Sequence, residues 1–214
     1  MRGPRSHPQN AFTLLELLTV VAVIVILLAL FLPAIQSAKV HANESGDANN
    51  LQQLGAAFDL YAGDNSMRIP STYPGPIYPY LKDPRVLAAP GDPNNYIILG
   101  LNPLSTTGGN NTSYIYNGFN DLGIYTNRGA NVLVPMADIP YPSDTVLLGR
   151  RSKGVPDFYM DFNTDDENGK VNLTAYDGGA NYLFANGTVR FLTASEYQDT
   201  LWLVNKNWKI PDVQ

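Results

Sequence analysis

The feature that most constrains this chain is a nearly unbroken apolar run close to its N-terminus. Residues 12–32 read FTLLELLTVVAVIVILLALFL, and at about 1.5 Å of rise per residue a helix of this length crosses a hydrocarbon core roughly 30 Å thick. Arg2 and Arg5 precede the run, and the next basic residue is Lys39. This charge asymmetry predicts a cytoplasmic N-terminus, with the rest of the chain on the other side of the membrane.

A single carboxylate, Glu16, interrupts the apolar run. A secretory signal cleaved near Ala34 or after Ser37-Ala38 is one interpretation of the segment, and an uncleaved signal anchor is another. Neither explains the acid, which costs roughly 2.5–3.5 kcal/mol inside an apolar helix on insertion scales. Glu16 therefore indicates a function or a partner inside the membrane.

The run Ala-Phe-Thr-Leu-Leu-Glu-Leu at residues 11–17 resembles the signature of type IV prepilins, which combines a basic leader, a fixed Glu and an apolar segment. The resemblance implies that a prepilin peptidase and N-methyltransferase removes residues 1–11, cleaving between Ala11 and Phe12, and methylates Phe12. Leaders of that family usually end in Gly, so Ala11 is a departure. Glu16 would become the fifth residue of the mature chain.

The liberated ammonium of Phe12 and the carboxylate of Glu16 are four residues apart and lie on the same face of a helix. In a polymer, Glu16 of one subunit can instead neutralise the Phe12 ammonium of a neighbour, and methylation keeps that charge. We therefore interpret Glu16 as an assembly residue and expect other pilin or pseudopilin subunits as partners.

The helix is expected to continue beyond the apolar run. Pro33 removes a backbone hydrogen bond and should kink the helix, so we predict one helix over residues 12–62, bent or frayed near Pro33 and Gly46. Residues 34–62 are interpreted as its amphipathic half, ended by Gly63-Asp64-Asn65. Its apolar residues recur at helical spacing and are expected to face a core: Leu51, Leu54, Phe58 and Tyr61.

Residues 63–214 are predicted to form a β-rich head domain. The chain is rich in Gly (18), Pro (16) and Tyr (13), a composition that favours turn-rich β structure. Asn186-Gly187 between two alternating runs predicts a hairpin with both turn residues at positive φ, and Thr193-x-x-Glu196 predicts a capping box for a helix over residues 196–204. One helical turn is expected around residues 79–82, and strands are expected at residues 113–117, 132–136, 145–149, 181–185 and 188–192. The fold class is α+β: a long N-terminal transmembrane helix packed on a small antiparallel sheet with long irregular loops.

Further segments resemble a group of bacterial pilin-like proteins abundant in planctomycete- and verrucomicrobia-type genomes. One branch of the group carries a His and an Asp at its C-terminal hairpin, where this chain has Tyr176 and Asn186, and a Cys-Pro pair is replaced by Ala89-Pro90. The resemblance therefore implies the shape of the group but no chemistry that depends on those side chains. The matching segments keep a fixed order along the chain: residues 50–55, 61–65, 80–84, 113–118 and 179–187.

An acidic stretch places oxygen ligands at alternate positions: Asp161, Asn163, Asp165 and Glu167. Such alternation suits Ca²⁺, which takes six to eight oxygen ligands, and the type II secretion pseudopilins that the N-terminus resembles often hold a C-terminal Ca²⁺. The stretch is not an EF-hand, because the sixth and twelfth positions are Asp166 and Asn172. A structural Ca²⁺ site and a solvated acidic turn both remain open.

Composition excludes several classes of function. The chain has no Cys, which rules out disulfides and thiol chemistry, and its only histidines, His7 and His41, lie in or beside the N-terminal segment. The formal net charge of −5 lacks the basic footprint of a nucleic-acid-binding protein. The missing nucleophile and His chemistry also argue against an exported enzyme.

We therefore expect a structural subunit of a type IV pilus-like or type II secretion filament, not an enzyme. It is expected in the bacterial inner membrane as a single-pass protein, or in a surface filament, with its head periplasmic or extracellular. The alternative is a processed, membrane-anchored extracytoplasmic binding protein that does not polymerise. Its binding face would be built from tyrosines: Tyr73, Tyr78, Tyr80, Tyr114 and Tyr116.

Overall fold

A computed structural model describes residues 13–70, 73–92, 112–117, 134–139, 141–152 and 170–199. The chain divides into two compact units, residues 1–40 and residues 41–214. The second unit contains the C-terminal half of the long helix together with the β-sheet.

The described part of the first unit is the N-terminal half of helix α1, which spans Leu14–Asp64. Its large apolar side chains between Leu14 and Ile35 are all 48–83% exposed. The helix continues through Pro33 and Gly46 without a break, which confirms a single helix. The bend expected at Pro33 stays a prediction.

The C-terminal half of α1 is amphipathic and packs on the head. Leu51, Leu54, Phe58 and Tyr61 are buried, as their spacing predicted, because residues three and four apart share one helix face. Gly55 lies on the same face, where a Cβ would come within 3.0 Å of Leu183 Cδ1. A small residue at this position therefore permits close approach of the helix to the sheet.

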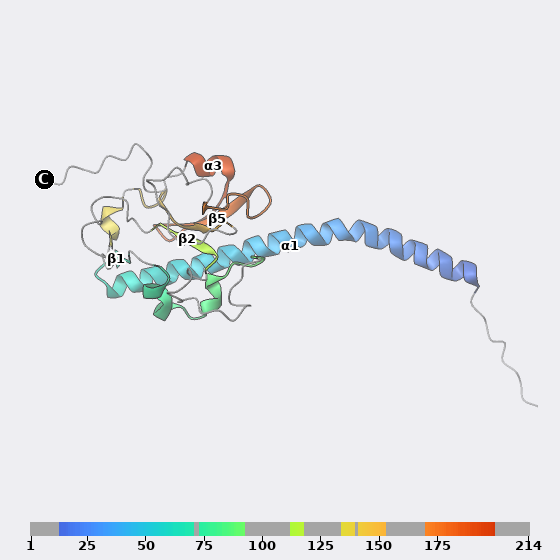
Figure 1. The fold of residues 1–214 in the computed structure, drawn as a ribbon, viewed down its shortest axis with the longest axis horizontal. Coiled ribbons are helices and arrows are strands. Elements are labelled where there is room, and N and C mark those ends of the chain that lie inside the picture. The colour runs from blue at the N-terminus through green and yellow to red at the C-terminus, as the bar shows by residue number, and fades with distance from the viewer. Residues whose placement is uncertain are drawn as a thin grey trace, which may run out of the picture. The chain divides into compact units, whose positions relative to one another are not determined.

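Four antiparallel strands form the main sheet: β2 (Tyr114–Tyr116), β4 (Val146–Arg150), β5 (Gly179–Phe184) and β6 (Val189–Thr193). Their spatial order is β2-β4-β5-β6. Figure 1 shows this sheet beside the C-terminal half of α1. These strands confirm four of the predicted strand positions and the antiparallel α+β arrangement within the head.

The hairpin between β5 and β6 lies at the predicted place, but the turn type predicted from Asn186-Gly187 was wrong. Gly187 has φ +81°, whereas Asn186 does not adopt positive φ. Gly187 N donates to Phe184 O at 2.9 Å, and Phe184 N donates to Thr188 O at 2.8 Å. These bonds describe a three-residue loop with Gly at the left-handed position, in place of a two-residue turn. Asn186 Oδ1 accepts from Thr188 N instead.

Both faces of the sheet are buried along β2, β4 and β5. Side chains on one face join the α1 stripe in a core that includes Tyr116, Leu148 and Leu183. Those on the other face form a second cluster with Ile115 and Phe184. The alternation of core membership along β2 and β5 follows from the two-residue period of a strand.

Several tyrosines that were considered for a binding face belong to the core. Tyr73, Tyr114 and Tyr116 are buried, and the ring of Phe58 stacks on Tyr116 at 5.4 Å and on Tyr73 at 6.2 Å between centroids. This burial overturns the aromatic binding face for these three residues. Their rings fill the space between α1 and the sheet.

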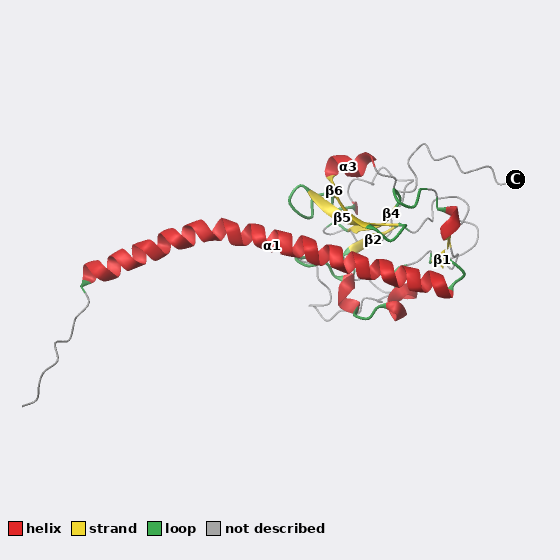
Figure 2. Ribbon diagram, turned by 180° about the vertical axis from the view of Figure 1, so that it is seen from behind, coloured by secondary structure: helices red, strands yellow, loops and turns green. Residues whose placement is uncertain are grey.

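Short elements complete the head. Strands β1 (Arg68–Ile69) and β3 (Val134–Pro135) pair with each other in a separate two-stranded sheet. The 3₁₀ helices η1 (Gly75–Tyr80) and η2 (Pro84–Leu87) lie beside α1 (Figure 2), and η3 spans Met136–Asp138. The helical turn expected at residues 79–82 is therefore replaced by two 3₁₀ helices, each with Pro in its first turn.

Helix α3 spans Ala194–Asp199. Thr193 N donates to Glu196 Oε2 at 2.9 Å, and Glu196 N donates to Thr193 Oγ1 at 3.3 Å. This reciprocal pair confirms the predicted capping box. The helix begins two residues earlier than expected, and residues 200–204 lie outside the described residues.

Candidate functional site

The first candidate site is the start of α1, where Glu16 already has a partner within its own chain. Thr13 N and Thr13 Oγ1 both donate to Glu16 Oε2 at 2.9 Å, and Glu16 N donates to Thr13 Oγ1 at 3.2 Å. The pattern is a capping box, in which the acid satisfies an otherwise unpaired donor at the start of the helix. Thr13 was not predicted as a functional residue, although its Thr-x-x-Glu spacing is visible in the sequence.

The cap supplies hydrogen bonds but no opposite charge. Both donors use Oε2, so Glu16 Oε1 accepts no hydrogen bond within the described part of the chain. Glu16 is exposed, and the apolar side chains that follow it in α1 are exposed as well. The carboxylate is therefore oriented by Thr13 yet still available to a cation from another molecule.

Several predicted site residues cannot be placed. The cleavage pair Ala11 and Phe12 lies outside the described residues, and so do the four proposed Ca²⁺ ligands: Asp161, Asn163, Asp165 and Glu167. No group of three or more acidic or His side chains suited to a metal occurs in the ranges that the structure describes. The Ca²⁺ site thus stays a prediction.

The second candidate site is a buried polar cluster, which we call the Asp47 cluster, formed by Asp47, Tyr114, Arg150, Tyr176 and Asn181. Tyr114 Oη donates to Asp47 Oδ1 at 2.8 Å, and Asn181 Nδ2 donates to Asp47 Oδ2 at 3.2 Å. Arg150 Nη1 lies 3.4 Å from Asp47 Oδ1. One carboxylate of α1 is thus bound by side chains from β2, β4 and β5.

Arg150 has further partners on its other sides. Its Nη1 donates to Tyr176 Oη at 3.2 Å, its guanidinium faces the Tyr176 ring at 6.0 Å from the centroid, and its Nη2 lies 3.8 Å from Asp92 Oδ2. The guanidinium therefore contacts two carboxylates and an aromatic ring. Tyr176 acts here as a partner of a buried cation.

The electrostatics of the cluster are dominated by burial. Desolvation raises the pKa of Asp47, against the opposing effects of Arg150 and of the hydrogen bonds from Tyr114 and Asn181. Burial likewise raises the pKa of Tyr114 and Tyr176, with the nearby Asp47 charge as a further cause. The tyrosines therefore remain neutral hydrogen-bond donors near neutral pH. Its geometry fits a structural role that fixes α1 against the sheet.

Sequence reasoning missed this cluster, although one signal was present. Asp47 lies four residues before Leu51, on the same face as the buried stripe of α1. An acid on an apolar helix face indicates a buried partner. Nothing local identifies that partner, because Arg150 is 103 residues away.

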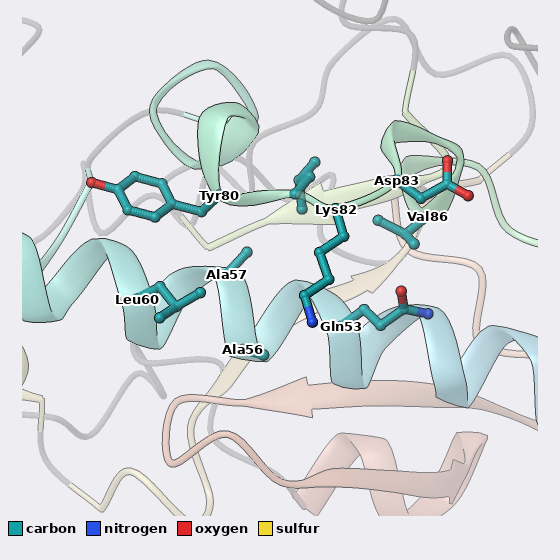
Figure 3. A pocket seen from close by; sticks show the side chains of 9 residues that line it. Gln53, Ala56, Ala57, Leu60, Tyr80, Lys82, Asp83 and Val86 are labelled. Carbon is teal, nitrogen blue, oxygen red and sulfur yellow. The ribbon is translucent and has the colours of Figure 1, made fainter.

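A small pocket of about 200 Å³ lies between α1 and the segment that joins η1 to η2 (Figure 3). Ala56, Ala57 and Leu60 of α1 line one side, and Lys82 extends from the opposite segment toward the helix. The remaining lining residues are Gln53, Tyr80, Leu81, Asp83 and Val86. The pocket is largely apolar, with one ammonium and one carboxylate at its edge.

Comparison with known proteins bears on the N-terminal site. A family model described as the prokaryotic N-terminal methylation motif matches residues 6–32. The chain has a type IV pilin-like N-terminus. The comparisons with curated proteins and with solved structures each found no match. Membership of the planctomycete-type group therefore stays a prediction.

The matched residues are those that carry the Thr13–Glu16 capping box and most of the exposed apolar segment. The motif implies processing by a prepilin peptidase and association with a membrane. Among the described residues, α1 is the one helix long and apolar enough to cross a bilayer. The motif and the helix together fit membrane anchoring.

Proposed function

We propose that this pilin-like protein is a structural subunit, a pilin or pseudopilin, of a type IV pilus-like or type II secretion filament. A prepilin peptidase would cleave between Ala11 and Phe12, and the subunit would assemble through residues 12–32. The head would face the periplasm or the exterior, with the N-terminal helix in the inner membrane before assembly.

The observation that carries this proposal is Glu16, a carboxylate oriented by Thr13 at the start of an apolar helix whose large side chains stay exposed among the described residues. A neighbouring subunit supplies both missing partners. Its Phe12 ammonium neutralises the acid, and its apolar helix replaces lipid contacts during extraction. Helix packing in an apolar environment depends on van der Waals contact and on satisfied polar groups.

The processed binding protein that does not polymerise has less support. Three of the five tyrosines that would form its binding face are buried: Tyr73, Tyr114 and Tyr116. The pocket of about 200 Å³ is smaller than the roughly 300–1,000 Å³ of small-molecule sites. The described head therefore offers side chains for protein contacts more readily than a ligand cavity.

The proposal is tested by Glu16→Ala in the full-length chain. We expect the mature N-terminus of the wild type and of the variant to start at methylated Phe12 by mass spectrometry. We expect filaments in the sheared fraction to be lost only in the variant, which should remain in the membrane. Glu44→Gln, a carboxylate change on the same helix outside the apolar run, is the matched control and should assemble normally.

Two results would contradict the proposal. One is a wild-type protein that retains Met1 or starts near residue 38, because the Phe12 ammonium would then never form. The other is Glu16→Ala filaments at wild-type abundance, because the acid would then have no part in assembly.

A further inference from the structure

The pocket between α1 and the η1–η2 segment is a small groove lined by residues of both. At about 200 Å³ it accommodates one or two side chains. Its α1 side consists of Ala56, Ala57 and Leu60, whose small or aliphatic side chains leave a shallow apolar surface. Val86 and Leu81 face it from the other side.

The edge of this groove carries one positive charge, that of Lys82, because the carboxylate of Asp83 is paired with Arg85. Asp83 is held by Arg85, with Arg85 Nη2 2.6 Å from Asp83 Oδ2 and Arg85 Nε 2.8 Å from the same oxygen. Lys82 is exposed, and it has no hydrogen bond or ion pair within the ranges that the structure describes. The groove therefore presents one uncompensated ammonium beside an apolar floor.

Leu60 adds exposed apolar surface at the same place. Its side chain is 57% exposed, one of four large apolar side chains exposed in the described part of the second unit. The other three are Met67, Tyr141 and Phe191, and none of them lines the groove. Leu60 and Lys82 together thus form a site that would bind an apolar side chain flanked by a carboxylate.

We propose that this groove receives an acidic, apolar segment from the head of a second copy of the chain. The chain carries 19 Asp and Glu against 14 Lys and Arg, and removal of the leader would take away Arg2 and Arg5. A copy of this net-negative chain offers acidic side chains that complement an uncompensated Lys82. The inference rests on the proposed filament and names one of its head-to-head contacts.

The contact is tested with a photo-crosslinking residue, p-benzoylphenylalanine, at position 56 of the full-length chain. We expect a covalent homodimer in assembled filaments, with the crosslink mapped by mass spectrometry to a segment that contains Asp or Glu. The same residue at Thr188, an exposed hairpin position outside the groove, is the matched control and should give at least tenfold less of the same dimer.

The outcomes separate this inference from the proposed function. Filaments that assemble normally without a dimer at position 56, or with an adduct to a different protein there, overturn the groove contact and leave the filament proposal intact. A homodimer at position 56 in membranes that never yield filaments supports the contact and contradicts the filament.

Charge variants provide a second measurement. Lys82→Glu should lower filament abundance at least tenfold, and Lys82→Gln should lower it less, because it removes the attraction without adding repulsion. Arg68→Glu changes another exposed cation that does not line the groove, and it should assemble normally. Circular dichroism of each variant checks the fold, and Lys82→Glu filaments at wild-type abundance would overturn the inference.

Discussion

Asp47 and Arg150 form a buried ion pair whose two members are not equivalent. Arg150 has a second carboxylate, Asp92, at 3.8 Å and the Tyr176 ring beside it. Within the described residues, Arg150 is the one cation that lowers the pKa of Asp47, and desolvation outweighs that effect. Breaking a buried pair is costly chiefly because the remaining charge stays uncompensated. The cost should therefore depend on which member is removed.

We predict that Arg150→Met lowers the free energy of unfolding by about 3–5 kcal/mol, because it leaves the Asp47 carboxylate buried without a cation. Asp47→Asn should cost only about 1–2 kcal/mol, since Asp92 still faces the guanidinium and the amide keeps part of the hydrogen bonding. Thermal or urea unfolding of the full chain in detergent, followed by near-ultraviolet circular dichroism, measures both. Equal losses of unfolding free energy in the two variants would contradict the predicted difference between Asp47 and Arg150.

The raised pKa of Asp47 predicts the pH dependence of stability. A raised folded-state pKa means that the folded protein binds this proton more tightly than the unfolded chain, whose ordinary value is 3.8. The contribution of Asp47 is therefore fully present below that value and is lost as the pH rises through the folded-state pKa. We expect the stability of the wild type, measured relative to Asp47→Asn, to rise as the pH falls from 7 toward 4. Unfolding of both proteins across this range tests it, and the opposite slope would show that Arg150 outweighs desolvation.

At the scale of elements, the β5–β6 hairpin depends on one backbone conformation. Gly187 has φ +81°, and a Cβ there would meet Asp59 Oδ2 at 3.7 Å, an ordinary contact. A substitution at this position thus introduces backbone strain and no serious clash. Gly63 of α1 differs, because a Cβ there would meet no heavy atom within 4 Å.

We predict that Gly187→Ala destabilises the head by about 1–2 kcal/mol, the cost of a left-handed conformation for a residue with a Cβ. Gly63→Ala, the matched control, should be neutral or stabilising by up to roughly 1 kcal/mol, because it restricts the unfolded chain. Chemical denaturation of both variants measures the difference. A neutral Gly187→Ala would imply that the loop relaxes to another turn.

Local patterns predicted those parts of the fold that depend on neighbours in sequence. The spacing of Leu51, Leu54 and Phe58 predicted their burial, and Thr193 with Glu196 predicted the capping box of α3. The Asn-Gly pair predicted a hairpin but the wrong turn, because a three-residue loop also needs Gly at positive φ and leaves Asn186 free to bond Thr188.

Features that depend on contacts between residues distant in sequence could not be predicted from the sequence. A tyrosine at an alternating strand position fits a core and a binding face equally well, so the pattern did not reveal that Tyr114 and Tyr116 are buried. The Asp47–Arg150 pair joins residues that no local rule connects. At the N-terminal site, Glu16 was identified because a charge in an apolar run is conspicuous in the sequence itself.

At the scale of the whole molecule, the head includes part of α1. Residues 41–214 form one compact unit, and the core contains Leu54 of α1 together with Leu148 and Leu183 of the sheet. Removing the C-terminal half of α1 would expose these residues to water. The chain also has no Cys, so this packing has no disulfide to support it.

We predict that a disulfide can join α1 to the loop that follows η2. A Cβ at Gly46 would lie 3.7 Å from Pro90 Cβ, within the roughly 3.5–4.5 Å that a disulfide requires. Gly46→Cys combined with Pro90→Cys should form the bridge in an oxidising compartment and raise stability by about 2–4 kcal/mol. A mobility shift on a non-reducing gel, reversed by reductant, detects the bridge.

Gly46→Cys alone is the control for the disulfide and should show no intramolecular shift, because the chain offers no other thiol. A double variant that stays reduced under oxidising conditions would contradict the close packing of α1 on this loop.

Arg150 has a second carboxylate partner in Asp92, whereas Asp47 has Arg150 as its one cation among the described residues. This difference also constrains how such a head can evolve. A lineage in which Asn first replaces Asp47 passes through an intermediate that still folds, because Asp92 keeps the guanidinium paired. A lineage that first loses Arg150 should pass through a less stable intermediate, because Asp47 then lies buried without that cation. Related heads should therefore include some that retain Arg150 without Asp47, and few that retain Asp47 without Arg150.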